Sequence, residues 1–116
     1  MKYIMLKSKI HGCVVTESKL DYEGSITIDR ELMDKAKLFP YEKVLVLDLT
    51  NGNRFETYVI EGERNSGVIC VNGAAARLVY PGDKLIILSF AILDENELAD
   101  YKPIIIITNE NNRVIQ

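Results

Sequence analysis

Short runs of alternating apolar and polar residues, separated by turn residues, most strongly limit how this chain can fold. Alternation places successive side chains on opposite faces of a β-strand, and β-branched residues favour that conformation. Such runs cover residues 5–10, 13–16, 25–28, 44–49, 54–61, 67–71, 84–92 and 102–108. Strands this short and this numerous predict a mainly β, barrel-like fold, in which closure removes exposed strand edges.

Only a few short segments of the sequence are predicted to be helical. Asp29 is predicted to cap a short helix that buries Leu32, Met33 and Ala36 on one side. The helix should end near Pro40, because the residue before a proline is disfavoured in the α conformation. Residues 74–77 and 94–100 predict two further short helical turns.

Turn residues predict how the strands are joined. The Asn51-Gly52 pair predicts a type I′ hairpin turn, because both residues tolerate positive φ angles. The polar residues 109–116 are expected to fray.

The length of 116 residues predicts one domain spanning residues 1–116. A net charge of -3 provides no basic field for a phosphate backbone, so no nucleic-acid partner is expected. Apolar runs reach only four residues, as at 104–107, and the lysine-rich start is not a signal peptide. We therefore expect a cytoplasmic protein without a membrane partner.

Histidine and cysteine are too scarce for the commonest catalytic and metal sites. The only histidine is His11, and the only cysteines, Cys13 and Cys70, lack zinc-site spacing. With no export signal, both cysteines are expected to be reduced and buried as small apolar residues. No metal is expected, and an enzyme of this sequence must obtain its reactive group elsewhere.

Three segments stand out, although each has a plain structural explanation. The Gly-Ser pair in residues 22–25 can be a turn entering a strand, and the small residues of 71–76 can be a tight turn into a helix. The third segment, 51–58, can be a solvated hairpin. Alternation there puts Arg54, Glu56 and Tyr58 on one face and Phe55 and Thr57 on the other.

In their order and spacing these segments resemble one family, the pyruvoyl-dependent aspartate 1-decarboxylases. The similarity runs from residue 3 to about residue 103 without gaps, and the matching residues are 5–11, 20–29, 50–52, 54–55, 57–58, 71–76, 82–83 and 86–87. The resemblance implies a six-stranded double-psi β-barrel with short helices. It also implies a homotetramer whose active sites lie between subunits.

The resemblance further implies a proenzyme that cleaves itself between Gly24 and Ser25, giving a β chain, residues 1–24, and an α chain, residues 25–116. The Ser25 hydroxyl would attack the Gly24 carbonyl, and elimination and hydrolysis would leave a covalently bound pyruvoyl group at position 25. Serine supplies both the nucleophile and the leaving oxygen, and glycine leaves the attack uncrowded.

The implied reaction converts L-aspartate to β-alanine and CO2, in the biosynthesis of pantothenate and hence coenzyme A. The pyruvoyl ketone would form a Schiff base with the substrate amine and accept the electrons released with CO2. By resemblance, Tyr58 is the proton donor to the substrate carbon. A phenol is neutral at working pH and so has a proton to give.

The resemblance also suggests how the substrate is held. Arg54 and Lys9 are the cations for the two carboxylates, and which cation takes which carboxylate is left open. Thr57 would polarise the Gly24–Ser25 carbonyl and contact the substrate. The remaining binding residues are Asn72, which orients the substrate, and Gly73, Ala74 and Ala75, whose backbone lines the pocket.

Three further residues need comment. His11 either positions the pyruvoyl group or a carboxylate, or makes a structural hydrogen bond, and Tyr22 is an additional candidate beside the cleavage site. Leu47 departs from the family pattern, which often has an aromatic residue there, so it would fill less of the pocket wall.

Two other functions are open to a small β-barrel. A binding module resembling a transcription factor would need a basic face, and no cluster of lysine and arginine is present. An inactive barrel of the same fold would have no reason to keep Gly24, Ser25, Arg54, Thr57 and Tyr58 together.

Overall fold

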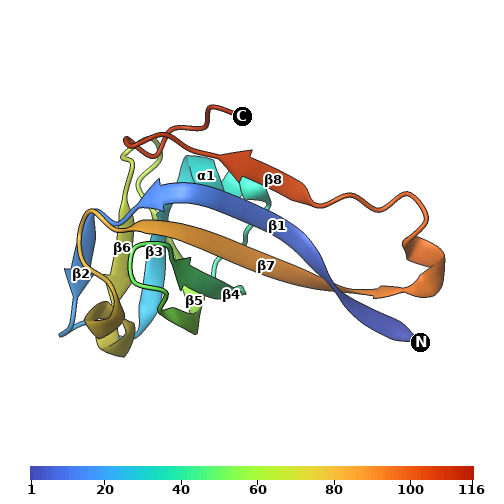
Figure 1. Cartoon of the computed structure of the whole chain (residues 1–116), viewed down its shortest axis with the longest axis horizontal. Coiled ribbons are helices and arrows are strands. Elements are labelled where there is room, and N and C mark those ends of the chain that lie inside the picture. The colour runs from blue at the N-terminus through green and yellow to red at the C-terminus, as the bar shows by residue number, and fades with distance from the viewer.

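Strands form most of the regular structure in the computed structural model, which describes residues 1–116. The strands are β1 (Lys2–Val14), β2 (Glu17–Lys19), β3 (Ser25–Asp29), β4 (Lys43–Asp48), β5 (Arg54–Gly62), β6 (Ile69–Asn72), β7 (Lys84–Asp94) and β8 (Ile104–Ile107). Helix α1 (Arg30–Ala36) and the 3-10 turns η1 (Gly73–Leu78) and η2 (Glu95–Glu97) complete the set. The prediction of a mainly β fold is confirmed (Figure 1).

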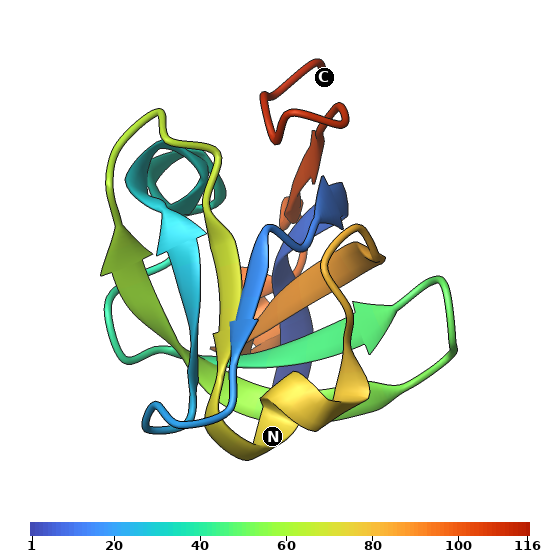
Figure 2. The same cartoon turned by 90° about the vertical axis from the view of Figure 1, so that its left-hand side faces the viewer.

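All eight strands join one hydrogen-bonded ladder in the order β2-β6-β3-β5-β4-β7-β1-β8. The end strands β2 and β8 do not pair with each other, so hydrogen bonds do not close the sheet. Only Val15 and Thr16 separate β1 from β2, and the Thr16 amide donates to the carbonyl of Ile69 just at the start of β6, at 2.8 Å. The two flanks of the ladder are therefore brought together by consecutive residues, and the strands curl around a shared interior (Figure 2).

Strand β1 was predicted as two strands, and that prediction was wrong. Residues 2–14 form one strand that pairs antiparallel with β7 along its length, with register shifts between Leu6 and Ser8 and between His11 and Cys13. Gly12, at the second shift, has a φ of 93°, a left-handed conformation that glycine adopts without strain. A bulge thus keeps the strand continuous where the alternation breaks. The β1–β7 ribbon extends well beyond the rest of the sheet (Figure 1).

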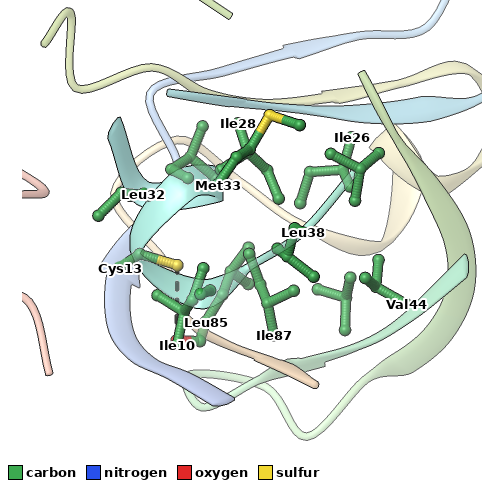
Figure 3. Close-up of a cluster of buried hydrophobic side chains, with 14 of the residues drawn as sticks. Ile10, Cys13, Ile26, Ile28, Leu32, Met33, Leu38, Val44, Leu85 and Ile87 are labelled. Atoms are coloured by element: carbon green, nitrogen blue, oxygen red, sulfur yellow. Dashed lines mark hydrogen bonds between the residues drawn. The ribbon is translucent and has the colours of Figure 1, made fainter. Parts of the chain in front are cut away.

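Helix α1 follows the prediction closely. The Asp29 carboxylate accepts a hydrogen bond from the Glu31 amide at 2.8 Å, and Lys37 ends the helix with a φ of 55°. Leu32, Met33 and Ala36 are the buried residues of the helix. Leu32 and Met33 lie in the interior beside Ile28 (Figure 3), so this helix closes one end of the sheet's interior.

The core is built from the alternate residues of the strands. Eighteen buried side chains form one cluster, and in β1, β3, β4 and β7 they include Ile10, Ile26, Val46 and Ile87. Their neighbours along each strand therefore point away from the core. This division into two faces determines where the candidate site residues lie.

The β4–β5 hairpin was predicted correctly, but its turn type was not. Of the Asn51-Gly52 pair only Gly52 has a positive φ, 80°, so the connection is not a type I′ turn. Residues 49–53 form a longer loop, in which an Asp48 carboxylate oxygen accepts hydrogen bonds from the Thr50 and Asn51 amides at 2.8 and 3.3 Å. The hydrogen bonds to the buried Asp48 carboxylate therefore set the conformation of this loop, and the preference of an Asn-Gly pair for a type I′ turn does not.

The prediction of a fraying C-terminal segment was also wrong. Thr108 forms a bridge with Val114, and the Ile115 amide donates to the Ile107 carbonyl at 2.9 Å. Asn112 is 2% exposed, and its side-chain amide donates to the carbonyls of Val14 and Gly67 at 2.9 and 2.7 Å. Polar residues thus attach the segment to the sheet, and a prediction of fraying based on composition misses these contacts. No helix of the chain has the length and apolar character needed to span a membrane.

Candidate active site

The Gly24–Ser25 junction lies where β3 begins. Ser25 pairs with Asn72 of β6, and the next residue, Ile26, pairs with Val59 of β5. The Ser25 side chain is 1% exposed. Strand pairing on both sides therefore fixes the position of this serine in the chain.

Asn72 holds the Ser25 hydroxyl directly. Its Nδ2 donates to Ser25 Oγ at 2.9 Å and to Thr27 Oγ1 at 3.1 Å, and Cys70 Sγ donates to its Oδ1 at 3.2 Å. Because Ser25 Oγ accepts from Asn72, its own proton and one lone pair remain for other partners. The amide thus fixes the oxygen atom that the sequence predicts as a nucleophile.

Gly73 lies directly against the predicted cleavage site. Its φ is 75°, and a Cβ atom there would lie 2.7 Å from the Cα and N atoms of Gly24 and 3.0 Å from the Tyr22 carbonyl oxygen. A Cβ on Gly24 would meet nothing within 4 Å. The backbone of η1 can therefore approach Gly24 closely only because residue 73 has no side chain. Ala74 and Ala75 follow in the same turn, while the Tyr22 ring is exposed beside the Lys19 ammonium group, 4.6 Å from its centroid.

The predicted proton donor Tyr58 lies one strand away from Ser25. Since Ile26 pairs with Val59 and both belong to the core, Ser25 and Tyr58 precede them at the same level, on the face opposite the core. Thr57 lies on the core side, with Phe55 and Val59, as alternation predicts. Thr57 and Tyr58 line a shallow hollow of about 370 Å³ together with Lys43 and Glu56.

A short loop supports the Tyr58 ring. The rings of Tyr41 and Tyr58 stack with centroids 6.3 Å apart and planes 28° from parallel. Tyr41 has a φ of 72°, and its amide donates to the Val59 carbonyl at 2.7 Å. The Lys7 ammonium group pairs with Glu42 in the same loop at 2.7 Å. No sequence signal points to Tyr41, because its contact depends on how the loop meets β5.

The remaining predicted residues lie on the same face but further along the ladder. Pairing places Arg54 opposite Leu47, Leu47 opposite Ile86, and Ile86 opposite His11. Lys9 pairs with Leu88 on that face, and all of these residues alternate with core residues. Leu47 thus lies between Arg54 and Ile86 on this face.

One chain does not bring all of these groups together. The ladder order puts β7 and β4 between β1 and β5, and strands are spaced ~4.8 Å apart. Lys9 and His11 are therefore roughly 14 Å from the line of β5 and ~19 Å from that of β3, measured along the sheet. The fold places Asn72 against Ser25 and Gly73 against Gly24, and puts Lys9 and His11 on a strand that pairs with neither β3 nor β6.

Two side chains near Ser25 were not predicted as part of the site. Thr27 and Cys70 both contact the Asn72 amide, although Cys70 was expected only as a buried small residue. Because side chains alternate along a strand, Thr27 must share a face with Ser25, and Cys70 must share a face with Asn72. Their meeting depends on the β3–β6 pairing, which no local pattern reveals. No group of three or more His, Cys, Asp or Glu side chains is placed to hold a metal ion.

The fold and this site define a small β protein with a serine buried at the entry to a strand, facing an asparagine–glycine pair. The family model described as aspartate decarboxylase matches residues 1–115, and the chain belongs to that family. The predicted family membership, and with it the class of carboxy-lyases, is confirmed.

Curated relatives carry one name. An aspartate 1-decarboxylase of Clostridium kluyveri is 58% identical over 116 residues, covering 100% of this chain and 91% of that protein. One of Thermoanaerobacter pseudethanolicus is 56% identical over 115 residues, covering 99% and 98%. One of Clostridium novyi is 57% identical over 114 residues, covering 98% and 93%. The similarity therefore extends over nearly the whole of each protein.

Proposed function

We propose that this chain is a cytoplasmic aspartate 1-decarboxylase that converts L-aspartate to β-alanine and CO2, supplying the biosynthesis of pantothenate and coenzyme A. Family membership and the names of the relatives support the reaction. The observation that carries the proposal is the buried Ser25 hydroxyl, held by Asn72 and adjoining a glycine against which Gly73 packs.

The single domain, residues 1–116, is made as a proenzyme that cleaves itself between Gly24 and Ser25. Ser25 Oγ bonds to the Gly24 carbonyl carbon while the peptide C–N bond breaks, and the hydroxyl proton passes to the nitrogen. Elimination then frees the Gly24 carboxylate, and hydrolysis releases ammonia, leaving pyruvoyl at position 25. The fixed Oγ atom and the space beside Gly24 suit this attack.

The bound pyruvoyl group supplies a sink for the electrons released with CO2. Tyr58, level with residue 25 and supported by Tyr41, holds the phenolic proton that the substrate carbon receives. Thr57, two residues before Val59 on the strand that pairs with β3, polarises the Gly24–Ser25 carbonyl and contacts the substrate. Asn72 and the backbone of Gly73, Ala74 and Ala75 orient the substrate beside Ser25, with Tyr22 at the margin.

The substrate's carboxylates are bound by Arg54 and Lys9. The Arg54 guanidinium can hold one carboxylate through two parallel hydrogen bonds, and Lys9 offers a point charge. Lys9 and His11 lie on β1, which β7 and β4 separate from β5 in the ladder. This separation supports an assembly, a homotetramer, in which a second copy supplies Lys9 and His11 to active sites between subunits.

The surface of the sheet supports such an assembly. Half-buried Leu45, Leu47, Ile86 and Leu88 flank the cations on the face opposite the core, and Ile92 is 68% exposed on the β1–β7 ribbon. A contiguous apolar face of this kind is typical of an interface between copies. For each subunit we propose a six-stranded double-psi barrel made of β1 and β3–β7, with β2 and β8, the end strands of the ladder, as additions.

Intact-mass measurement of the purified protein tests this proposal. We expect two chains, residues 1–24 and 25–116, with the larger blocked at its N-terminus, and β-alanine formed from aspartate. Borohydride with aspartate should add mass only to the 25–116 chain. A wild-type chain that stays whole after prolonged warming and yields no β-alanine overturns the proposal.

Two variants separate cleavage from decarboxylation. Ser25→Ala lacks the nucleophile, so it should remain one chain and be inactive. Tyr58→Phe should still cleave but turn over aspartate ~10²–10⁴-fold more slowly, the usual effect of losing a positioned acid. A loss smaller than about tenfold would contradict the role of Tyr58 as sole donor.

A further inference from the structure

Four polar or thiol side chains gather on one face of the β3–β6 pair. Ser25 lies opposite Asn72 and Thr27 lies opposite Cys70, while the intervening Ile26 and Val71 point into the core. Ser25, Cys70 and Asn72 are each no more than 4% exposed. Their hydrogen bonds are therefore made to one another rather than to solvent.

The Asn72 amide has a defined direction in this group. Its Nδ2 has two protons, and both are used, by Ser25 Oγ at 2.9 Å and Thr27 Oγ1 at 3.1 Å. Its Oδ1 accepts from Cys70 Sγ at 3.2 Å. An amide turned by 180° would instead present its oxygen to the Ser25 hydroxyl and its NH2 group to the thiol.

The direction matters for the attack of Ser25 on Gly24. Negative charge develops on Oγ as its proton leaves, and a hydrogen bond donated to that oxygen stabilises the charge. The turned amide would offer Oγ an acceptor and no donor. The thiol that fixes the direction must itself be protonated, and burial raises the pKa of Cys70, which keeps its proton at neutral pH.

We propose that Cys70 and Thr27 are positioning residues that hold the Asn72 amide with Nδ2 toward Ser25 Oγ and thereby accelerate self-cleavage. This inference rests on the proposed function. Cys70 acts on the amide oxygen and Thr27 on the second amide proton, so each acts on Ser25 only through Asn72.

The test follows the cleavage of freshly purified precursor by mass spectrometry as the 25–116 chain accumulates. Cys70→Ala removes the donor to Oδ1 and should slow cleavage about tenfold, and Cys70→Ser, which keeps a donor, should restore most of the rate. Thr27→Val should slow cleavage and Thr27→Ser should not, because only valine lacks the hydroxyl. This readout does not depend on the activity of the mature enzyme.

Cys13 provides a matched control. It is as buried as Cys70, and its thiol donates to the Leu85 carbonyl without touching Asn72. Cys13→Ala should lower the melting temperature as Cys70→Ala does, yet cleave within twofold of the wild-type rate. A slow rate in both variants would show general damage to the fold and overturn the inference.

The outcomes separate this inference from the proposed function. If the wild type cleaves and forms β-alanine while Cys70→Ala and Thr27→Val cleave at the wild-type rate, the inference fails and the function stands. If the wild type does not cleave, both fail. Should Cys70→Ala not fold, the Thr27→Val and Thr27→Ser pair alone supports or overturns the inference.

Discussion

Gly73 shows how one absent atom can shape a site. Its φ of 75° lies in the left-handed region, and the space where its Cβ would be is filled by the Gly24 backbone. Left-handed backbone alone costs a non-glycine residue about 1–2 kcal/mol. The clash adds to this, because both groups involved are backbone and neither can rotate away.

We expect Gly73→Ala to slow self-cleavage at least tenfold and to lower the free energy of unfolding by about 2 kcal/mol. Gly82→Ala separates the two effects. Gly82 has a φ of 96°, but a Cβ there meets nothing within 4 Å. It should therefore lose only the ~1–2 kcal/mol of the left-handed backbone while cleaving at the wild-type rate, as urea denaturation and mass spectrometry will show. Equal cleavage by the two variants would contradict the importance of the Gly73–Gly24 contact.

Asp48 has the one buried side-chain oxygen without a hydrogen-bond partner, its Oδ2. Its other oxygen organises the loop after β4. Burial, and then the neighbouring Asp83, raise the pKa of Asp48 above its usual value. A raised pKa means that folding favours the protonated form. The contribution of Asp48 to the free energy of unfolding is therefore fully present below the ordinary carboxyl pKa near ~3.9. It is lost as the pH rises through the pKa of Asp48 in the folded protein.

Asp48→Asn should therefore stabilise the protein at pH ~7 by roughly 1 kcal/mol, because it keeps the accepting oxygen and removes a buried charge. The advantage should vanish as the pH falls below ~4, where Asp48 is itself protonated. Urea denaturation at both pH values measures it, with the exposed Asp100→Asn as control. An equal gain at both pH values would contradict this account.

At the scale of elements, the C-terminal segment is a structural part of the folded domain. The side chain of Asn112 accepts from the Val14 amide at 2.7 Å and donates to the Val14 and Gly67 carbonyls. One residue thus links the end of β1 to the turn before β6. A buried backbone group that loses such a partner destabilises the folded state, because water cannot reach it to form a replacement hydrogen bond.

Asn112→Ala should lower the free energy of unfolding by about 2–4 kcal/mol, since it leaves buried donor and acceptor groups unpaired. Asn111→Ala, next to it and exposed, should change stability by less than ~0.5 kcal/mol. Thermal denaturation of the uncleaved Ser25→Ala background gives the comparison without interference from processing. A small effect at Asn112 would favour the fraying that composition predicts.

The elements that could be predicted from sequence are those whose pattern is local. Alternation located β3, β4 and β5, and the Asp29 cap with its three apolar residues located α1. The continuity of β1 through Gly12 and the docking of Asn112 could not be predicted, because both depend on distant partners. The Asn51-Gly52 turn failed for the same reason, since the Asp48 carboxylate overrides a local preference.

At the scale of the whole molecule, the family resemblance identifies the candidate site residues but does not predict their positions relative to one another. The sequence names Lys9, Arg54 and Tyr58 as one set, yet the ladder separates Lys9 from Tyr58 by two intervening strands. It also gives no hint that Thr27 and Cys70 join Ser25, because strand pairing alone brings them together. The distribution of site residues over the sheet is therefore information that only the fold contains.

The place of residues 1–24 in the ladder has a consequence for the proposed cleavage after Gly24. Strand β1 lies between β7 and β8, and β2 pairs with β6, so this segment is hydrogen-bonded on several sides. A cut after Gly24 would leave it seated as a separate peptide, as in fragment complementation. In the uncut chain the covalent link holds residues 1–24 at a high effective concentration relative to the rest of the sheet, and the cut removes this link. The stability of the cleaved protein would then depend on protein concentration, whereas that of the uncut chain does not.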